Sequence, residues 1–385
     1  MTFLINRNAC PDTPYTETER AVISEESAKA ARDTIGLCPA HAATPLHVLS
    51  KAAADLNVGA VYLKDEGPRF GLNAFKSLGG AYAVAMILSR SLSERLGKPV
   101  SVTDLARGTY AEHTRGVTVA CASSGNHGRA VAAGARHFGC AAVIYVPGDT
   151  VQSRIDAIEG EGARVVRHPG TYDEAVRDVE ETARAEGWVV ISDTSWPGYE
   201  DIPKTVMTGY TVMAAEALEQ MAALGAPPPT HVIIQGGVGG VAAATCAQLT
   251  QALPDAVPTI VVAEPEAAAC VLASLEAGEP RPATGDLETI VGPLNCREVA
   301  AVAWPILKNR LTAAITVTDP EILAAIADLK AGTPSVATGP AGAAGFAAAK
   351  QAAAAADIRA ALGLTAESVV LLFGTEGAVA GIGDA

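Results

Sequence analysis

Short apolar, β-branched runs alternate along the chain with longer segments of helix-like pattern. Most of the runs are continuously apolar, which is typical of strands buried on both faces of a parallel sheet. Helices are predicted between them, for example over residues 172–186, with Thr171 as the expected cap, and over residues 204–224. Repeated strand–helix units predict right-handed crossovers and an open α/β sheet. The predicted strands are residues 60–63, 117–122, 142–146, 164–167, 188–192, 231–235, 260–263, 314–317 and 369–373.

The order of these elements predicts two domains. Four strand candidates and three helical segments lie between Val117 and Trp196, a compact run that can form a small sheet of its own. Because the other strands fall on both sides of this run, we expect residues 117–200 to form a small α/β domain. It would be inserted into a large domain made of residues 1–116 and 201–385. A cleft between two such domains is a common ligand site.

Three stretches fall outside this alternation. The polar start of the chain, up to about Leu37, and residues 276–294 are predicted to be irregular, and the second stretch contains three prolines. The Ala-rich residues 341–361 are predicted to form one packed helix, because alanine has high helix propensity and Gly339-Pro340 precedes them.

Length and charge narrow the possible functions. The 385 residues favour two parts, since single cores stop growing near roughly 250–300 residues. The formal charge is −14 and the Lys and Arg residues are scattered, which disfavours nucleic-acid and anionic-membrane partners. The seven cysteines include no close pair, so a reduced chain without zinc or disulfide framework is expected. No stretch approaches the roughly 20 apolar residues of a membrane span, and a soluble, cytoplasmic protein is expected.

One lysine lies in an apolar stretch where a helix is predicted to begin, Leu72-Asn73-Ala74-Phe75-Lys76-Ser77-Leu78. Burial near a helix N-terminus disfavours the ammonium, and the neutral amine can form an imine with an aldehyde. The structural alternative for Lys76 is a side chain that reaches from the helix start to solvent, because lysines are rarely fully buried.

Two strand-to-helix turns are suited to binding anions. The strand ending at Ala122 runs into Ser123-Ser124-Gly125-Asn126-His127-Gly128, which gathers hydroxyls and backbone N–H groups at a helix N-terminus. The strand His231–Gln235 runs into Gly236-Gly237-Val238-Gly239-Gly240, whose backbone can present several N–H donors to a phosphate. This second turn has neither GxGxxG spacing nor a P-loop lysine, which disfavours a Rossmann NAD enzyme. Taken singly, the first turn is also compatible with a Ser N-cap followed by a glycine turn, and the second with a simple tight turn.

Together, the lysine segment and the two turns resemble the fold-type II pyridoxal 5′-phosphate (PLP) enzymes, the family of threonine dehydratase, serine racemase and cysteine synthase. The resemblance is strongest to the diaminopropionate ammonia-lyases and covers nearly the whole chain. It implies a fold like that of the tryptophan synthase β chain, with two open, twisted, mostly parallel sheets flanked by helices and PLP bound by the large domain. The matching segments are Leu63-Lys64-Asp65-Glu66, Arg69-Phe70-Gly71-Leu72-Asn73-Ala74-Phe75-Lys76, Gly125-Asn126-His127-Gly128-Arg129, Asp193-Thr194 with Trp196 and Gly198-Tyr199-Glu200, Glu264-Pro265 and Thr375-Glu376-Gly377.

This resemblance implies roles for individual residues. Lys76 would form the imine with PLP and later move protons, and Asn126 would hydrogen-bond the phenolic oxygen of the cofactor. The loop Gly236–Gly240 would hold the phosphate, and Thr375 would face the pyridine nitrogen. A hydroxyl at that position does not hold the nitrogen protonated, which favours α-proton abstraction followed by β-elimination.

Ser124 departs from the pattern of the ammonia-lyases. The residue before their Gly-Asn-His-Gly is typically an Asp that serves one enantiomer of the substrate, while the counterpart of Asp193 serves the other. A neutral hydroxyl is a poor base, so the L substrate is favoured. Because serine racemase-like enzymes use the same Ser as an acid/base residue, Ser124 is either a carboxylate-binding hydroxyl or a proton shuttle. Asp193 is the α-proton base, a binding group for a distal ammonium, or a structural turn residue, and Ser123 is a candidate contact for the substrate carboxylate.

These roles predict a PLP-dependent lyase that converts 2,3-diaminopropionate, with its L form preferred, to pyruvate and ammonia. The resemblance suggests a homodimer. Alternatives that stay open are a serine, threonine or hydroxyaspartate dehydratase, a racemase or a β-replacing synthase of the same fold, and a non-catalytic PLP-binding protein. His127 and His231 are expected to be structural. No Asp, Glu or His cluster has the spacing of metal ligands, so no catalytic metal is expected.

Overall fold

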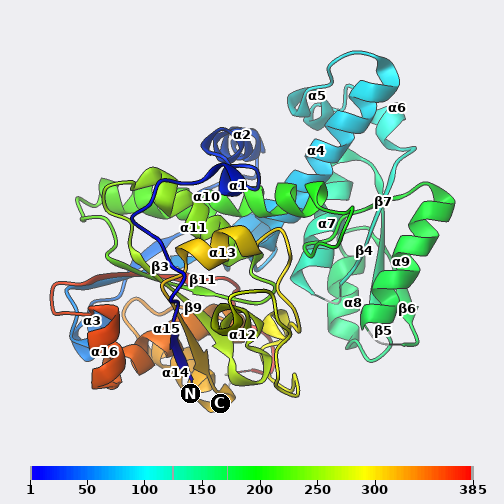
Figure 1. Ribbon diagram of the computed structural model, residues 1–385. Coiled ribbons are helices and arrows are strands. Elements are labelled where there is room, and N and C mark those ends of the chain that lie inside the picture. Colours follow the sequence, from blue (N-terminus) through cyan, green and yellow to red (C-terminus); the bar gives the residue numbers. More distant parts are fainter. Residues whose placement is uncertain (1, 124, 171, 383–385) are drawn as a thin grey trace. The chain divides into compact units, whose positions relative to one another are not determined.

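The computed structural model, shown in Figure 1, describes residues 2–123, 125–170 and 172–382. The candidate Ser124 and the expected helix cap Thr171 lie outside the described residues. Among the described residues, no helix is both long and apolar enough to cross a bilayer.

The chain forms two compact units, which we call the large unit and the small unit. Both have mostly parallel sheets with helices packed on them, as the sequence predicted. The large unit comprises Met1–Ala28, Ala43–Phe75 and Thr211–Ala385, and the small unit comprises Lys29–Ala42 and Lys76–Tyr210.

The large unit contains a seven-stranded sheet with the order β1-β10-β9-β8-β11-β3-β2. The five central strands are parallel, whereas β1 and β2 pair antiparallel at the two edges. All five central strands were predicted, since each is a buried apolar run. The two edge strands were missed because each has only three residues. The strands are β1 (Phe3–Ile5), β2 (Leu46–Val48), β3 (Ala60–Asp65), β8 (His231–Gln235), β9 (Thr259–Pro265), β10 (Ala313–Val317) and β11 (Val369–Gly374).

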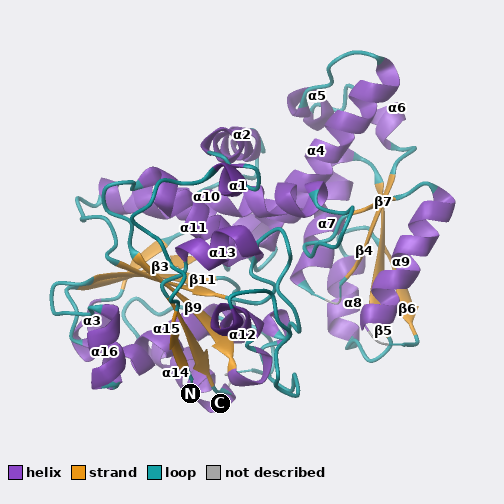
Figure 2. Cartoon of the chain, viewed as in Figure 1, coloured by secondary structure: helices purple, strands orange, loops and turns teal. Residues whose placement is uncertain are grey.

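Helices cover both faces of this sheet, with α11 and α13 on one side and α14, α15 and α16 on the other (Figure 2). The second face packs against α3 as well, in one continuous apolar core that includes Leu56, Ile326 and Phe346. The helices are α3 (Ser50–Leu56), α11 (Gly240–Ala252), α12 (Cys270–Ala277), α13 (Trp304–Arg310), α14 (Asp319–Ala331), α15 (Pro340–Ala354) and α16 (Ala356–Leu362), with short 3₁₀ turns η1 (Arg69–Gly71), η2 (Glu266–Ala268) and η3 (Gly292–Leu294).

The prediction of one helix over residues 341–361 was wrong in one respect. Ala355 has an extended backbone, with φ −92° and ψ 111°, and separates α15 from α16. Neither glycine nor proline lies at this break, so the sequence pattern carries no sign of it. Residues 276–294 are mostly irregular, as predicted, apart from the last turn of α12 and η3.

The prediction of an irregular N-terminus was also wrong. This region contains β1, α1 (Glu17–Arg20) and α2 (Glu25–Gly36). Helix α1 begins with a capping box, in which Thr16 Oγ1 accepts from the backbone N–H of Glu19 and Glu19 Oε2 accepts from that of Thr16. Glu19 also forms a buried ion pair with Arg310, with Nε–Oε1 at 2.6 Å. The Thr-x-x-Glu spacing was visible in the sequence, whereas the distant arginine was not.

The small unit contains a four-stranded parallel sheet with the order β6-β5-β4-β7, and all four strands were predicted. The strands are β4 (Thr118–Ala122), β5 (Ala141–Pro147), β6 (Arg164–His168) and β7 (Val189–Val190). The helices are α4 (Lys76–Leu96), α5 (Val102–Ala106), α6 (Ala111–Thr114), α7 (Asn126–Phe138), α8 (Gln152–Glu159) and α9 (Tyr172–Glu186), and α10 (Asp201–Ala223) begins in this unit.

The small unit is larger than the expected domain of residues 117–200 because α4 packs closely on α7. A Cβ at Gly80 would lie 2.8 Å from the Cβ of Ala130, and a Cβ at Gly134 would lie 2.8 Å from the Cα of Ala81. Such distances permit only glycine, so the two helices approach each other at these positions by backbone contact. The packing joins α4 to the strands and helices that follow it, and the longer segment of the small unit therefore begins at Lys76.

Candidate active site

Lys76 is the first residue of α4, and its amine is turned toward a carboxylate. Lys76 Nζ lies 2.5 Å from Asp193 Oδ2, and each side chain is 18% exposed. The same amine lies 5.8 Å from the ring centroid of Tyr210, which is buried. The amine is therefore held inside the small unit by an ion pair and an aromatic ring. This geometry removes the alternative of a lysine that extends into solvent.

Asp193 follows β7 in a short turn, and its environment favours the charged form. Burial raises the pKa of this carboxyl, but the electrostatic interactions with His127 and Lys76 and the hydrogen bond from Lys76 lower it well below its ordinary value. Asp193 is therefore ionised at neutral pH. An ionised carboxylate can accept a proton or bind an ammonium, which are the two functional interpretations of the sequence.

The turn around Asp193 is supported by Tyr199. The hydroxyl of Tyr199 donates to the carbonyl oxygen of Val190 at 2.8 Å and accepts from the backbone N–H of Ser192 at 2.9 Å. Its ring stacks on Trp196, with centroids 4.1 Å apart and an interplanar angle of 11°. These aromatic residues therefore hold the segment that presents Asp193.

The Ser123–Gly128 turn leads directly into α7, whose first residue is Asn126. Ser123 Oγ accepts from the backbone N–H of Gly125 at 3.3 Å. A Cβ at Gly128 would lie 2.8 Å from the carbonyl oxygen of Ser123, so this turn needs a glycine there. Strands β4 and β7 are parallel neighbours, and the residues that follow both strands therefore emerge at one edge of the sheet. The structure thus brings Ser123 and Asn126 to the same edge as Asp193.

The glycine loop lies at the carboxyl edge of the large sheet, between β8 and α11. Gly237 and Gly239 have φ values of 65° and 86°, which favour glycine. A Cβ at Gly236 would lie 2.6 Å from Cγ of the buried Glu264, and one at Gly239 would lie 2.6 Å from Cδ1 of Leu307. With Val238 and Gly240, these residues form a side-chain-poor turn next to the first backbone N–H groups of α11, which a helix leaves without intrahelical partners.

The side chain of Glu264 packs against Gly236 of this loop. Its two carboxyl oxygens accept from the backbone N–H groups of Val271 and Leu272 at 2.9 Å and 2.8 Å. Burial raises the pKa of Glu264 to about 7, against the effect of these donors. The neighbouring Cys270 Sγ donates to the carbonyl oxygen of Gly237 at 3.3 Å. Cys270 therefore ties the loop to the segment after β9.

Thr375 follows β11, the strand between β8 and β3 in the sheet. Its side chain is buried, and its carbonyl oxygen accepts from the backbone N–H of Phe75 at 3.1 Å. Because β8, β11 and β3 are parallel, Thr375 shares an edge of the large sheet with the glycine loop. Glu376 accepts from the N–H of Ala341 at 3.0 Å, so it holds the turn after the strand.

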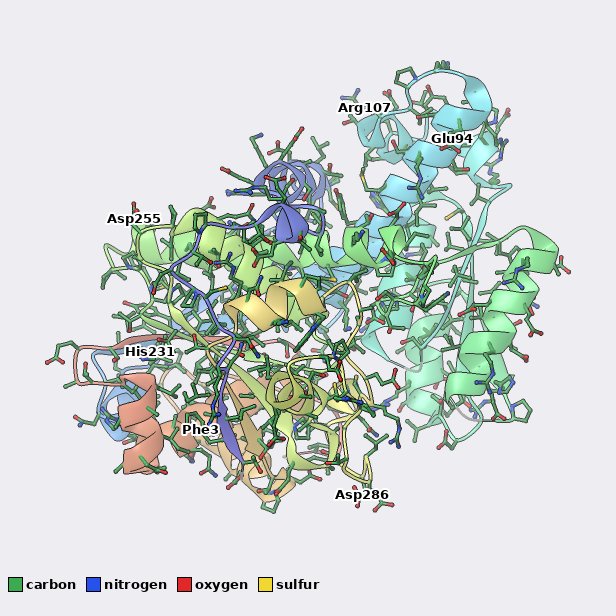
Figure 3. The ribbon with its side chains drawn as sticks, in the orientation of Figure 1. Phe3, Glu94, Arg107, His231, Asp255 and Asp286 are labelled. Carbon is green, nitrogen blue, oxygen red and sulfur yellow. The ribbon has the colours of Figure 1, made fainter. Side chains whose placement is uncertain are left out.

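The two expected structural histidines have different surroundings. His231 (labelled in Figure 3) is buried at the start of β8, and its Nε2 donates to the carbonyl oxygen of Leu362 at 2.9 Å. Burial lowers its pKa, so it is a neutral structural residue. His127, by contrast, lies beside Asp193, with 3.8 Å between Nδ1 and Oδ2.

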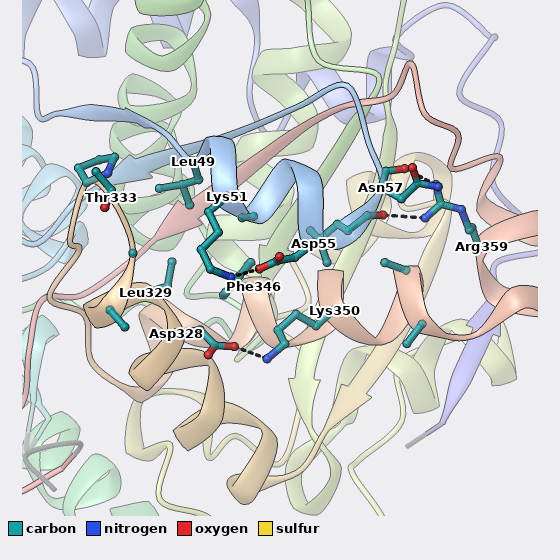
Figure 4. Close-up of a pocket in the computed structure, with 17 residues that line it drawn as sticks. Leu49, Lys51, Asp55, Asn57, Asp328, Leu329, Thr333, Phe346, Lys350 and Arg359 are labelled. Atoms are coloured by element: carbon teal, nitrogen blue, oxygen red, sulfur yellow. Dashed lines mark hydrogen bonds and ion pairs between the residues drawn. The ribbon is translucent and has the colours of Figure 1, made fainter.

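A cavity of about 450 Å³ lies in the large unit among α3, α14, α15 and α16 (Figure 4). Its walls include Phe346, and its rim carries the ion pairs of Lys51 with Asp55 and of Lys350 with Asp328. Of the described site residues predicted from the sequence, none lines this cavity, and four of its charged residues form two ion pairs with one another. Among the described residues, no group of three or more His, Cys, Asp or Glu side chains has the arrangement of a metal site.

Comparison with known proteins identifies the family. A family model described as pyridoxal-phosphate dependent enzyme matches residues 37–374. The chain belongs to this family.

Named relatives agree with this assignment. The chain is 38% identical to a diaminopropionate ammonia-lyase of Salmonella typhimurium over 283 residues, which is 73% of this chain and 70% of that protein. It is 38% identical to the enzyme of that name from Escherichia coli over 299 residues, 77% of this chain and 73% of the relative. The crystal structure of holo diaminopropionate ammonia lyase from Escherichia coli superposes with a TM-score of 0.85 at 32% identity, covering 98% of this chain and 93% of that one. The predicted family and fold class are confirmed.

The donor chemistry of this PLP-dependent enzyme fits its cofactor. The large unit provides a glycine loop at a helix N-terminus for an anion and a buried hydroxyl at Thr375. The small unit provides an amine with little solvent exposure at Lys76 and the polar residue Asn126. Each group lies at the carboxyl edge of the parallel sheet in its own unit, which is where α/β proteins bind ligands.

A buried ion network was missed when the sequence was interpreted, although its residues Lys64, Glu66 and Arg69 lie in segments that carry the family resemblance. Arg69 donates to Glu66 through Nε at 2.8 Å and to Glu216 through Nη2 at 2.6 Å. Lys64 Nζ lies 2.7 Å from Glu216 Oε2. Thr44 Oγ1 donates to Glu66 Oε1 at 2.7 Å. The network holds the 3₁₀ turn η1 in the segment that leads to Lys76. Within this turn Phe70 has a φ of 53°, in the left-handed region.

Glu216→Gln is predicted to destabilise the protein by about 3 to 5 kcal/mol, because it leaves two buried cations with one carboxylate. Burial raises the pKa of Glu216, but Arg69 and Lys64 lower it to about 2, from an ordinary value of 4.5. Its stabilisation is therefore present above about pH 4.5 and lost as the pH falls toward 2. Urea unfolding between pH 7 and pH 3 should show that the free energies of unfolding of Glu216→Gln and the wild type approach each other as the pH falls.

The matched control for this substitution is Asp33→Asn, which removes an exposed ion pair with Lys29 and should change the unfolding midpoint little. A Glu216→Gln protein as stable as the wild type at pH 7 would contradict the importance of the network.

Proposed function

We propose that this chain is an ammonia-lyase that converts 2,3-diaminopropionate and water to pyruvate and two molecules of ammonia. The observation that carries the proposal is the pair of Lys76 Nζ and Asp193 Oδ2, 2.5 Å apart and largely removed from solvent. It is an amine suited to an imine beside a carboxylate suited to a proton or an ammonium. Its support from relatives is the 38% identity to two enzymes named diaminopropionate ammonia-lyase.

The cofactor would be held by four candidate groups. Lys76 would bind it through the amine, Asn126 would donate to its ring oxygen, and the loop Gly236–Gly240 would bind its phosphate through backbone N–H groups. Thr375 would face its ring nitrogen. PLP, when bound, supplies the electron sink that makes the α-carbon of an amino acid acidic.

The chain's own groups then handle protons and charge. Asp193, kept ionised next to the Lys76 ammonium, either takes the α-proton or binds the distal ammonium of the substrate. In the second case Lys76 is the base, as its released amine can accept the proton. The hydroxyls of Ser123 and Ser124 are the proposed contacts of the substrate carboxylate, with Ser124 alternatively acting as a proton shuttle.

Lys76→Ala should lose the imine absorbance of the PLP-loaded protein and its turnover of L-2,3-diaminopropionate. Borohydride reduction followed by peptide mapping should attach the cofactor to Lys76 in the wild type. Lys51→Ala is the matched control, since Lys51 is exposed on α3 and, among the described residues, pairs with Asp55. A Lys76→Ala protein that keeps both the band and full turnover would rule out this role of the lysine.

Substrate choice is tested by pyruvate release from both enantiomers of 2,3-diaminopropionate and from L-serine and L-threonine. We expect at least tenfold higher kcat/KM for the L than for the D isomer, because Ser124 is a neutral hydroxyl. Ser124→Asp should raise activity on the D isomer. Equal use of both isomers by the wild type contradicts this account of Ser124, and faster release from serine or threonine would favour a dehydratase. Spectral binding without any product would favour a non-catalytic PLP protein.

We further propose that the enzyme works as a homodimer, as the family resemblance implies, and that it is located in the cytoplasm, as the wide spacing of its cysteines suggests. Light scattering of the purified protein should give about twice the chain mass of 39.1 kDa, and cell fractionation should recover it with cytoplasmic proteins. A monomer at micromolar concentration would exclude the dimer.

A further inference from the structure

His127 is anchored by one ring nitrogen and left without a hydrogen bond at the other. It is the second residue of α7 and is buried, with 4% of its surface exposed. Its Nε2 lies 2.9 Å from the carbonyl oxygen of Ile191, the residue after β7. Because a carbonyl oxygen only accepts hydrogen bonds, the ring proton of neutral His127 belongs on Nε2.

The second ring nitrogen faces Asp193. His127 Nδ1 lies 3.8 Å from Asp193 Oδ2 and has no hydrogen-bond partner among the described residues. A buried polar atom without a partner calls for a physical explanation. In the neutral ring, Nδ1 presents a lone pair to an anionic carboxylate, which is unfavourable. With a second proton the same geometry is attractive, so the charge on His127 is coupled to the charge on Asp193.

In this structure Lys76 Nζ lies 2.5 Å from Asp193 Oδ2, and the ammonium balances the charge of the carboxylate. In the proposed function, Lys76 is bound to the cofactor for part of each cycle and then cannot serve Asp193 as a free ammonium. Three other groups that interact with Asp193, namely Tyr199, Tyr210 and Cys121, are neutral, since burial raises the pKa of each. His127 is the remaining group near Asp193, among the described residues, that can take up a positive charge.

We propose that His127 takes up a proton at Nδ1 when the Lys76 ammonium leaves Asp193, and so keeps that carboxylate ionised and in place. The proton comes from solvent and returns to it when Lys76 is free again. His127 is a positioning residue that acts through Asp193. The inference rests on the proposed role of Lys76, but the coupling of the three side chains is a property of the protein without cofactor.

The coupling is tested by NMR titration of the histidine rings in cofactor-free protein, with His127→Gln used to assign the His127 signal. In Lys76→Met the ammonium is absent, and we expect the titration midpoint of His127 to rise by at least about one pH unit relative to the wild type. In the double variant Lys76→Met with Asp193→Asn this rise should disappear. The exposed His137, at the other end of α7, is an internal control that should titrate alike in all proteins. An unchanged midpoint of His127 in Lys76→Met overturns the proposal.

A second test separates proton uptake from structural support. In His127→Gln the side-chain amide can still donate to the Ile191 carbonyl, but no group titrates beside Asp193. We expect the kcat of His127→Gln to be about tenfold below that of the wild type at low pH. At a pH where His127 is neutral throughout the cycle, the two kcat values should be equal. A constant ratio of kcat across the pH range would mean a merely structural role and contradict the proposal.

A failure of this inference can be told apart from a failure of the proposed function. If borohydride reduction does not attach the cofactor to Lys76 of the wild type, the proposed function fails, whatever the titration of His127 shows. If Lys76 is labelled in both the wild type and His127→Gln while the titration midpoints do not move, only the inference about His127 fails.

Discussion

Parallel strands that end at a common edge are the constraint on which the candidate site depends. In the large unit, β8, β11 and β3 are neighbours, so the glycine loop and Thr375 emerge side by side. In the small unit, β4 and β7 are neighbours, which brings Asn126 to the same edge as Asp193. In each unit, the strand order alone brings together residues that are far apart in the sequence, and no contact between their side chains is needed for this. The chemistry follows from strand order together with the identity of the first few residues after each strand.

Much of this fold was predictable because buried parallel strands are continuous apolar runs. All nine predicted strands are present, and α9 covers residues 172–186 as expected. The failures have local physical causes. β1 and β2 are three-residue antiparallel edge strands, too short for a pattern, and the break at Ala355 involves no helix-breaking residue. The capping box at Thr16 was visible in the sequence and was not used.

The residues of the candidate site could be named from the sequence, but the contacts between their side chains could not. Motif reasoning identified Lys76 and Asp193, yet nothing in the sequence pairs two side chains that are 117 positions apart. The same holds for Arg69 and Glu216, 147 positions apart, whose ion network stabilises a segment with left-handed backbone at Phe70 and Asn73. Such pairings depend on the tertiary fold. The roles drawn from the family resemblance, such as that of Thr375, remain proposals about what these placements do.

Local charges, and not the net charge of −14, decide what the site can bind. An anionic cofactor would be repelled by the overall field, but backbone N–H groups at the start of α11 act within a few ångströms, where screening by solvent is weakest. The same reasoning applies to Asp193. A carboxylate with this little exposure is stabilised as an anion by a nearby cation, and among the described residues Lys76 and His127 form its ion pairs. In the proposed function Lys76 gives up that task while it is bound to the cofactor, and this is why we assign the second cation beside Asp193 to His127.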